Sequence, residues 1–359
     1  MFLFDFIQLF ADAGTLVNAT GGYVNSGTGA VTNFSTGYTL APELKTFYDT
    51  ELLENARVEM FYAQFAKKQP LPANNGTTVE WRKWNTFAPA SQLQEGVIPT
   101  GQRFGVSTKT GSINQYGTYT TVSDKLEMRA YDDVILGATE EMGASAAETQ
   151  EKLIRDALLV NTNVMYCDNI TLATGAVAGT PTTPATMEAS TTVMSMMTPA
   201  MVAKAVTKLK KDRVPTINGK YYAVIHPSVA EDLRKSDGWM EAHKYAAPEE
   251  IFNGEIGELH GCRFIENVFA PVLGSSYANK ATTVTYATYF FGKDGFGIID
   301  PEGGALEMIV HDKSEIGGPL NQFSTIGYKF ETNGATILYT ERVLRVMSCS
   351  SYSATDVAN

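Results

Sequence analysis

The side chains that could do chemistry in this sequence begin with two pairs of adjacent acids. Asp132–Asp133 and Glu140–Glu141 supply carboxylates of the kind that serve as general acid and base in hydrolases. Both pairs fall in a segment with helical periodicity, where adjacent residues point in different directions. A helix cap or a solvated face therefore explains them better, and an unrecognised hydrolase remains the less favoured function.

Histidines and cysteines are few and isolated. No two histidines have metal-pair spacing, and the cysteines are odd in number and lack CxxC spacing, so neither a zinc site nor a disulfide framework is predicted. His226 precedes Pro227, where a turn residue is a better interpretation than a catalytic base. The motifs GxSxG, HExxH and GxxxxGK[ST] are absent, and we predict no enzyme, no cofactor and no metal site. The histidines of the chain are His226, His243, His260 and His311, and its cysteines are Cys167, Cys262 and Cys349.

Two other groups of side chains are suited to binding. A basic cluster on the polar side of a predicted helix is ordinarily a solvated face, and its alternative is a salt-dependent contact with an acidic neighbour or nucleic acid. Trp81 and Trp84 flank two basic residues and could form a stacking platform, but exposed aromatics on a hairpin more often mark a protein interface. The basic cluster consists of Lys204, Lys208, Lys210, Lys211 and Arg213.

The element around which the chain is organised is a predicted helix from Tyr131 to Val160. Its mostly apolar face recurs every three or four residues, and a helix of this length measures about 45 Å. Small residues in its middle cost helix propensity at the glycines but let another backbone come close. The residues that define this helix are Ile135, Gly137, Met142, Gly143 and Leu153.

The segments before this helix lack a core of their own. Residues 13–41 are rich in Gly, Thr, Asn and Ser, which predicts an extended arm lying on something else. Strand-like alternation in Thr77–Phe87 and Gly111–Met128 predicts one long hairpin around a polar tip. A hairpin this long normally needs a neighbour to lie against.

Shorter patterns predict the remaining elements. A helix is expected from Pro42 to Phe65, and another starts at Pro199 with Thr198 as its cap. Ser228 and Glu231 predict a capping box for a third helix. Two strands are expected to pair across Asn333-Gly334.

Composition excludes several classes of protein. The net charge of −11 argues against gripping nucleic acid through its phosphates. The opening MFLFDFIQLFADAG is too short to span a membrane, and no other stretch approaches 18 apolar residues, so no membrane partner is predicted. Cysteine usage favours synthesis in a reducing, intracellular compartment. An acidic α+β chain whose arm and hairpin need neighbours favours an assembly protein over an enzyme.

Several segments together resemble one family of assembly proteins. Residues 7–12 (IQLFAD) resemble the LQLFAD-like opening of phage capsid-gene products, and 93–99 (LQEGVIP) resembles the L-x-E-G-x-x-P hairpin tip of tailed-phage major capsid proteins. Residues 254–263 resemble the G-E-I-G-x-x-x-G-x-R segment of that family, and 318–329 its x-P-L-x-Q…x-G-W/Y-K pattern. The chain is therefore similar to the phage N-four-type major capsid family, which has the HK-ninety-seven-like coat fold.

This resemblance implies an α+β HK-ninety-seven-like phage capsid fold with named parts. They are an N-terminal arm (1–40), a helix entering the P-domain (41–76), an E-loop (77–127), a P-domain segment with the spine helix (128–195), an A-domain (196–320), and P-domain return strands with the C-terminus (321–359). The E-loop residues expected to contact other subunits are Trp81, Trp84, Leu93, Glu95, Gly96, Pro99 and Arg103.

The function implied by the resemblance is that of a virion coat protein, made in the host bacterial cytoplasm. It would assemble as hexamers and pentamers into an icosahedral shell enclosing the double-stranded DNA of a tailed phage, without sequence-specific DNA contacts. Its other expected partners are a scaffolding protein, a portal and a decoration protein. An encapsulin-type protein nanocompartment, which has the same fold, is the alternative.

Overall fold

A computed structural model describes most of the chain. The described residues are 60–72, 76–85, 87–90, 92–93, 95–96, 98, 101–129, 134–236, 257–274, 284–302, 304, 306–312, 322–352 and 356–359, with the backbone of the strands β1 (Thr15–Leu16), β2 (Tyr23–Val24) and β3 (Val31–Thr32). Most of the predicted arm, the predicted helix from Pro42 as far as residue 59, and residues 254–256 and 318–321 of the family-like segments lie outside them.

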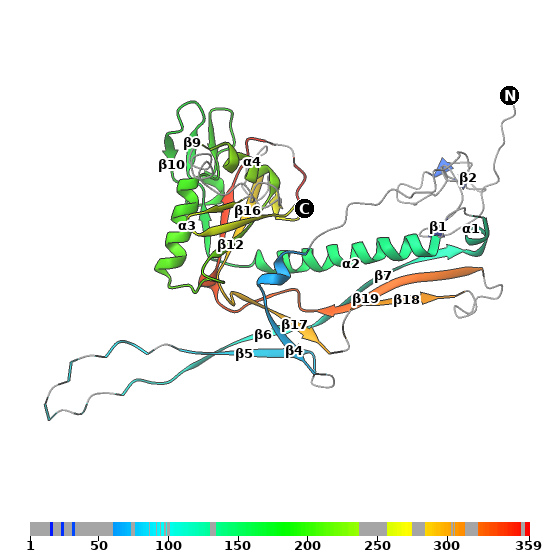
Figure 1. Cartoon of the computed structure of the whole chain (residues 1–359), viewed down its shortest axis with the longest axis horizontal. Coiled ribbons are helices and arrows are strands. Elements are labelled where there is room, and N and C mark those ends of the chain that lie inside the picture. The colour runs from blue at the N-terminus through cyan, green and yellow to red at the C-terminus, as the bar shows by residue number, and fades with distance from the viewer. Residues whose placement is uncertain are drawn as a thin grey trace. The chain divides into compact units, whose positions relative to one another are not determined.

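The chain forms two compact units (Figure 1). The first contains Met1–Glu59, Asn114–Thr149 and Pro301–Thr332, and the second contains Met60–Ile113, Gln150–Asp300 and Asn333–Asn359. Each unit is therefore assembled from segments far apart in sequence.

The first unit is built on a four-stranded sheet in the order β1-β7-β19-β18. Strand β7 (Asn114–Ser123) pairs along its whole length with β19 (Phe323–Thr332), and β18 (Glu307–His311) pairs with the other edge of β19. Val122 and Ile326 on this sheet and Leu126 on the short helix α1 (Asp124–Arg129) form a small core.

The predicted long helix is present as α2 (Val134–Leu158), 25 residues long. Its apolar face packs as the periodicity indicates, because Ile135 and Met142 lie against the small core of the first unit. The expected close backbone approach at its glycines is not found, since a Cβ at Gly137 or Gly143 would meet nothing within 4 Å among the described residues. The division between the two units falls within α2, after Thr149.

The second unit is built on a seven-stranded sheet. Its main path runs β13-β14-β12-β16-β21-β8, with β15 pairing β16. Every residue of the two central strands β16 and β21 is buried. The strands are β8 (Val164–Tyr166), β12 (Tyr221–Ile225), β13 (Gly257–Leu259), β14 (Cys262–Glu266), β15 (Val272–Leu273), β16 (Thr285–Phe291) and β21 (Val343–Ser348).

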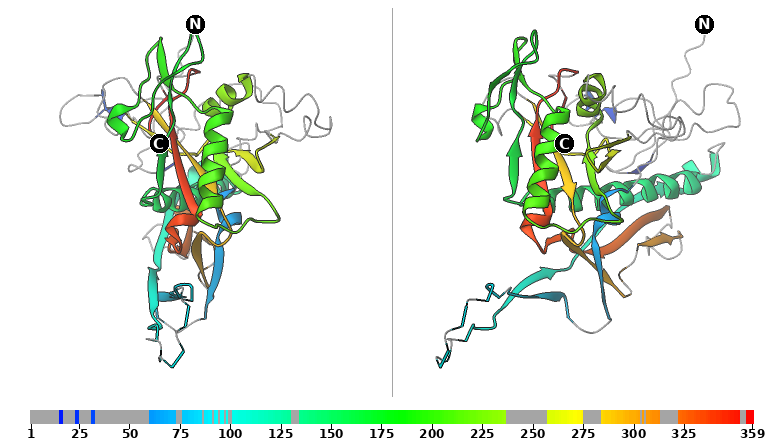
Figure 2. Two further views of the ribbon diagram at one scale, coloured as in Figure 1. Left: turned by 90° about the vertical axis from the view of Figure 1, so that its left-hand side faces the viewer. Right: turned by 60° about the vertical axis from the view of Figure 1, so that its left-hand side comes forward.

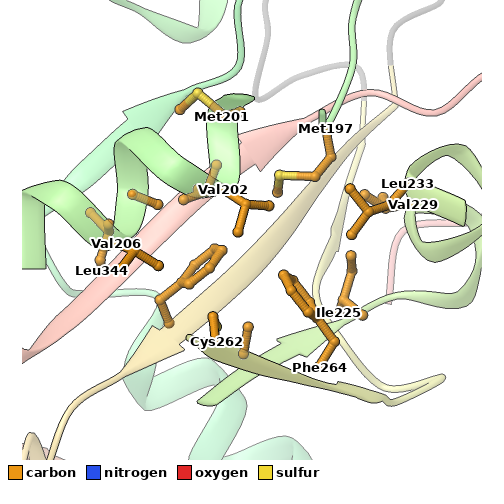
Figure 3. Close-up of a cluster of buried hydrophobic side chains, with 14 of the residues drawn as sticks. Met197, Met201, Val202, Val206, Ile225, Val229, Leu233, Cys262, Phe264 and Leu344 are labelled. Carbon is orange, nitrogen blue, oxygen red and sulfur yellow. The ribbon is translucent and has the colours of Figure 1, made fainter. Parts of the chain in front are cut away.

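Two helices pack on this sheet. In α3 (Pro199–Lys211), Thr198 accepts a hydrogen bond from the N–H of Met201, as the predicted cap requires. The ribbon views show α3 and α4 (Pro227–Lys235) beside the sheet (Figure 2). Their buried stripes meet the sheet in the largest apolar cluster of the unit (Figure 3). Figure 3 shows Val202 in the layer above the sheet residue Phe264.

Two smaller sheets and a hairpin complete the second unit. A three-stranded sheet contains β10 (Val177–Gly179), β9 (Asn169–Thr171) and β11 (Val193–Ser195), and another contains β20 (Thr336–Ile337), β17 (Phe296–Pro301) and β4 (Lys67–Leu71). The hairpin consists of β5 (Thr78–Trp84) and β6 (Val106–Ser112). Three short 3-10 helices are η2 (Tyr62–Phe65), η3 (Pro184–Thr186) and η5 (Thr340–Arg342).

Three sequence predictions about local structure are wrong where the structure describes the residues concerned. The described end of the helix expected from Pro42 to Phe65 is the 3-10 helix η2, followed by β4. The segment expected to form the second strand of the hairpin is split, because β6 pairs with β5 whereas β7 pairs with β19. The runs on either side of Asn333-Gly334 do not pair with each other, since β19 pairs with β7 and β18 whereas β21 pairs with β16 and β8.

The predicted capping box of α4 is also replaced by a different cap. The Nδ1 atom of His226 accepts a hydrogen bond from the N–H of Ser228 at 3.2 Å. The Ser228 hydroxyl instead donates to Asp356 at 3.0 Å, and Glu231 forms an ion pair with Lys235 at 2.7 Å. His226 is thus a helix-capping residue, and burial lowers its pKa against the opposing charge of Asp356.

We expect this cap to make the protein acid-sensitive. Because the folded-state pKa of His226 is depressed, its contribution to stability is present above the unfolded pKa of about 6.5 and is lost as the pH falls through the folded pKa. The substitution His226→Asn keeps a hydrogen-bond acceptor at the cap but removes the titratable group, so it should lessen the loss of stability between pH 7 and pH 5. The substitution His226→Ala removes the acceptor and should lower the free energy of unfolding by about 1 kcal/mol at pH 7. Denaturant unfolding at each pH measures this, and equal pH slopes for wild type and His226→Asn would contradict it.

Candidate functional site

The β5–β6 hairpin holds most of the residues expected to contact other subunits. Its strands pair in regular antiparallel register from Thr78 opposite Ser112 to Trp84 opposite Val106. Beyond the last pair, the N–H of Asn85 donates to the carbonyl of Gly105 at 2.9 Å. The paired strands β5 and β6 form an extended ribbon in Figure 1.

The loop of the hairpin is braced by one glutamine. The amide of Gln102 accepts from the N–H of Ala88 at 2.8 Å and donates to the carbonyl of Ala88 at 3.1 Å. A side-chain amide that bonds both backbone groups of one residue takes the place of a strand partner. This contact holds the two limbs of the loop together beyond the paired strands.

Trp81 anchors the root of the hairpin. Its half-buried ring lies against two glycines, because a Cβ on Gly111 would stand 2.9 Å from Trp81 Cζ3 and a Cβ on Gly297 would stand 3.1 Å from Trp81 Cζ2. On the same strand, Lys83 pairs with Glu341 at 3.2 Å and lies 4.4 Å from the Tyr339 ring centroid. Trp81 therefore packs within its own chain and is half-buried instead of exposed, and its contact with another subunit stays a prediction.

Trp84 has the opposite environment. Its ring stacks on Phe104 across the hairpin with centroids 4.3 Å apart, and Phe104 stacks on Phe87 at 5.5 Å. All three rings are exposed, Trp84 by 60% of its surface. Exposed aromatics of this kind are enriched where proteins meet.

The tip of the hairpin adds more exposed apolar surface. Leu93 is 68% exposed and Ile98 is 93% exposed. We name the five side chains Trp84, Phe87, Leu93, Ile98 and Phe104 the hairpin surface. Several large apolar side chains exposed on one hairpin without its own core indicate an interaction surface.

The other expected contact residues lie around this surface. Glu95, Gly96 and Arg103 are exposed, and Gly96 has a φ of +79°, a backbone conformation that favours glycine at this turn. Pro99 lies outside the described residues. Phe87 and Phe104 were missed by the sequence analysis, although their positions on both sides of the loop were a signal for a cross-hairpin pair.

The groups first considered for chemistry do not converge on a reaction centre. Asp132 and Asp133 lie outside the described residues, and Glu140 and Glu141 lie on α2. Within the described chain, no three histidine, cysteine or acidic side chains are placed to hold a metal ion, and no helix is long and apolar enough to cross a membrane. Burial raises the pKa of the thiols of Cys167 and Cys262, which makes them poor nucleophiles.

The basic cluster is a mainly solvated face, as expected. Lys204 forms an ion pair with the mostly buried Asp168. Lys210, Lys211 and Arg213 are exposed at the C-terminal end of α3, where cations suit the helix dipole.

Comparisons with known proteins agree with this arrangement. The protein-family profile described as phage capsid protein matches residues 106–334. Among solved structures, the capsid of cyanophage Pam1 matches with a TM-score of 0.64 and 11% identity over 90% of this chain and 100% of that one. The acid-stable capsid of Helicobacter pylori bacteriophage KHP30 gives 0.63 and 10% over 89% and 99%, and that of cyanophage P-SCSP1u gives 0.58 and 15% over 90% and 98%. No curated protein matches.

The fold is thus that of HK-ninety-seven-like coat proteins, in the α+β class expected from the sequence. Because the profile spans more than half of the chain, the chain belongs to the phage capsid protein family. It is a phage major capsid protein, a virion component that assembles in many copies into the shell.

Proposed function

We propose that this chain assembles as hexamers and pentamers that close into an icosahedral shell around double-stranded DNA, with a structural role and no catalytic one. The observation that carries the proposal is the hairpin surface, five apolar side chains exposed on a segment with no core of its own. In the shell these side chains are buried against a neighbouring copy. Many such weak contacts add up through multivalency, while each stays reversible enough to correct errors during growth.

The parts of the chain have the roles implied by the coat fold. The N-terminal arm comprises residues 1–40, the E-loop comprises residues 77–127 and centres on the hairpin, and the A-domain comprises residues 196–320. The spine helix is α2, and residues 41–76, 128–195 and 321–359 build the P-domain. The chain is made in the host bacterial cytoplasm and works with a scaffolding protein, a portal and a decoration protein. The net charge of −11 fits a container that does not bind its genome tightly.

Electron microscopy of the overexpressed chain, with its scaffolding protein co-expressed, tests the proposal. Closed shells with hexameric and pentameric capsomers are the expected result, and nucleic-acid content is then measured in particles from infected cells. Monomers or small oligomers under all these conditions would reject shell assembly. Shells that hold a protein cargo in place of DNA would support the encapsulin-type alternative.

A further inference from the structure

Glu151 is a buried acid that joins three distant parts of the second unit. Its side chain is fully buried in α2. Its Oε1 atom accepts hydrogen bonds from the N–H of Phe61 at 3.1 Å and the N–H of Tyr62 at 3.4 Å. The same oxygen accepts from the side-chain amide of Asn267, in the loop after β14, at 2.7 Å. One carboxyl oxygen therefore holds residues 61–62 and the Asn267 loop against the helix.

The second oxygen of Glu151 has no such support. Oε2 is buried without a hydrogen-bond partner among the described residues, as is the hydroxyl of Tyr62. Among the described residues no ion pair joins Glu151 to a base. Arg155, one turn along the helix, is paired through Nη2 with Asp156 at 2.8 Å, and its buried Nη1 has no hydrogen-bond partner there. Further titratable groups in this region include Tyr289, whose ring lies edge-on to that of Tyr62 at 6.0 Å, and Lys152, whose Nζ lies 5.6 Å from the centroid of the Phe269 ring.

An ionised carboxylate in these surroundings is unfavourable. Burial of the charge is more unfavourable than the three hydrogen bonds are favourable. Burial therefore raises the pKa of Glu151, against the opposing effect of the hydrogen bonds from Phe61, Tyr62 and Asn267. A protonated Glu151 still offers a carbonyl oxygen to the three donors, although each hydrogen bond is weaker than to the carboxylate. Protonation therefore removes the buried charge without breaking the contact.

We propose that Glu151 is a proton-dependent latch that fastens residues 60–62, which follow the first 59 residues, to α2, and that this fastening weakens when Glu151 ionises. The latch consists only of contacts within one subunit. It would hold for this fold whether or not the shell has the proposed composition.

The sign of the pH effect follows from linkage, because releasing residues 60–62 opens Glu151 to water and removes the burial, which is a larger effect on its pKa than the lost hydrogen bonds. A raised folded-state pKa means that the latch is strongest below the ordinary glutamate pKa of about 4.3 and weakens as the pH rises through the folded pKa. Because one proton is involved, the opening equilibrium rises by at most about tenfold per pH unit within that window and is constant above it.

Hydrogen exchange on the full-length unassembled subunit tests the latch. Protection factors of the Phe61 and Tyr62 amides, corrected for intrinsic exchange, are measured from pH 4 to pH 8 in wild type and in Glu151→Gln. Glutamine presents the same acceptor oxygen without a charge, so its protection factors should not change with pH. Wild-type protection should fall by up to about tenfold per unit over the titration.

Glu141→Gln, on an exposed position of the same helix, is the matched control and should behave as wild type. The latch is rejected if wild type shows no pH dependence, or if Glu151→Gln retains the wild-type dependence. Low protection in Glu151→Gln at every pH would show that the ionised form is the one that holds residues 60–62, which also rejects it. None of these outcomes depends on shell assembly, so the latch and the proposed function can fail independently.

Discussion

Deleting residues 88–103 and joining the ends with Asn-Gly is expected to leave a folded subunit that forms no shells. The deletion removes Leu93, Ile98 and the Gln102–Ala88 contact but no residue of a buried cluster. The strands of the hairpin remain paired up to Trp84 and Val106. Shortening a loop lowers the entropy cost of closing it, so unfolding free energy should change by about 1 kcal/mol or less.

The loss of assembly has a separate physical reason. The removed tip carries exposed apolar side chains whose burial in a neighbouring copy supplies about 25 cal/mol per Å². Each lost contact recurs in every subunit of the shell, so a modest loss per contact is multiplied over the assembly. Circular dichroism checks the folded state and electron microscopy checks the particles.

A full-length variant separates the apolar contact from the length of the loop. Leu93→Ser with Ile98→Ser keeps the backbone and should also lower particle yield strongly. Val177→Ser with Val268→Ser, two exposed positions outside the hairpin, is the matched control. Normal particles from the deletion variant would reject the role assigned to the hairpin.

The long helix and α3 could be predicted from sequence because their information is local. Apolar spacing fixes a helical face, and Thr198 followed by Pro199 fixes a start, so α2 and α3 were found close to their true limits. Strand pairing could not be predicted in the same way, because the partner of a strand is a segment far away in the sequence. The sequence between Gly111 and Met128 looks like one strand, yet Ile113 separates β6 from β7, and these two strands pair with different partners.

The sequence indicated that the hairpin segment carries the candidate contact surface, but it did not indicate which single residues are exposed on it. Trp81 and Trp84 have the same type and lie three positions apart, so they are equivalent by composition. Their environments differ because Gly111 and Gly297, from two other strands, make room for the Trp81 ring alone. The cap of α4 was missed for a similar reason, since Asp356 draws the Ser228 hydroxyl away and leaves His226 to accept the helix N–H.

Replacing Trp81 or Gly111 is expected to destabilise the root of the hairpin. A Cβ on Gly111 would stand 2.5 Å from the Thr336 hydroxyl oxygen and 2.9 Å from the Trp81 ring, closer than either contact allows. Gly111→Ala should therefore cost about 1–3 kcal/mol through overpacking. Trp81→Ala should cost about 3 kcal/mol, because it removes a large ring from between two strands and leaves a cavity. Chemical unfolding of the unassembled subunit measures both.

Gly101 in the same hairpin supplies the control for Gly111. A Cβ there would meet nothing within 4 Å, and its backbone lies outside the left-handed region. Gly101→Ala should therefore leave the unfolding free energy unchanged. If Gly111→Ala proves as stable as Gly101→Ala, the Trp81 ring is not held where the glycines place it. If Trp81 does anchor the root, particle yield should fall together with subunit stability in Gly111→Ala, whereas the tip deletion lowers particle yield alone. This difference distinguishes residues that stabilise the hairpin from residues that contact a neighbouring subunit.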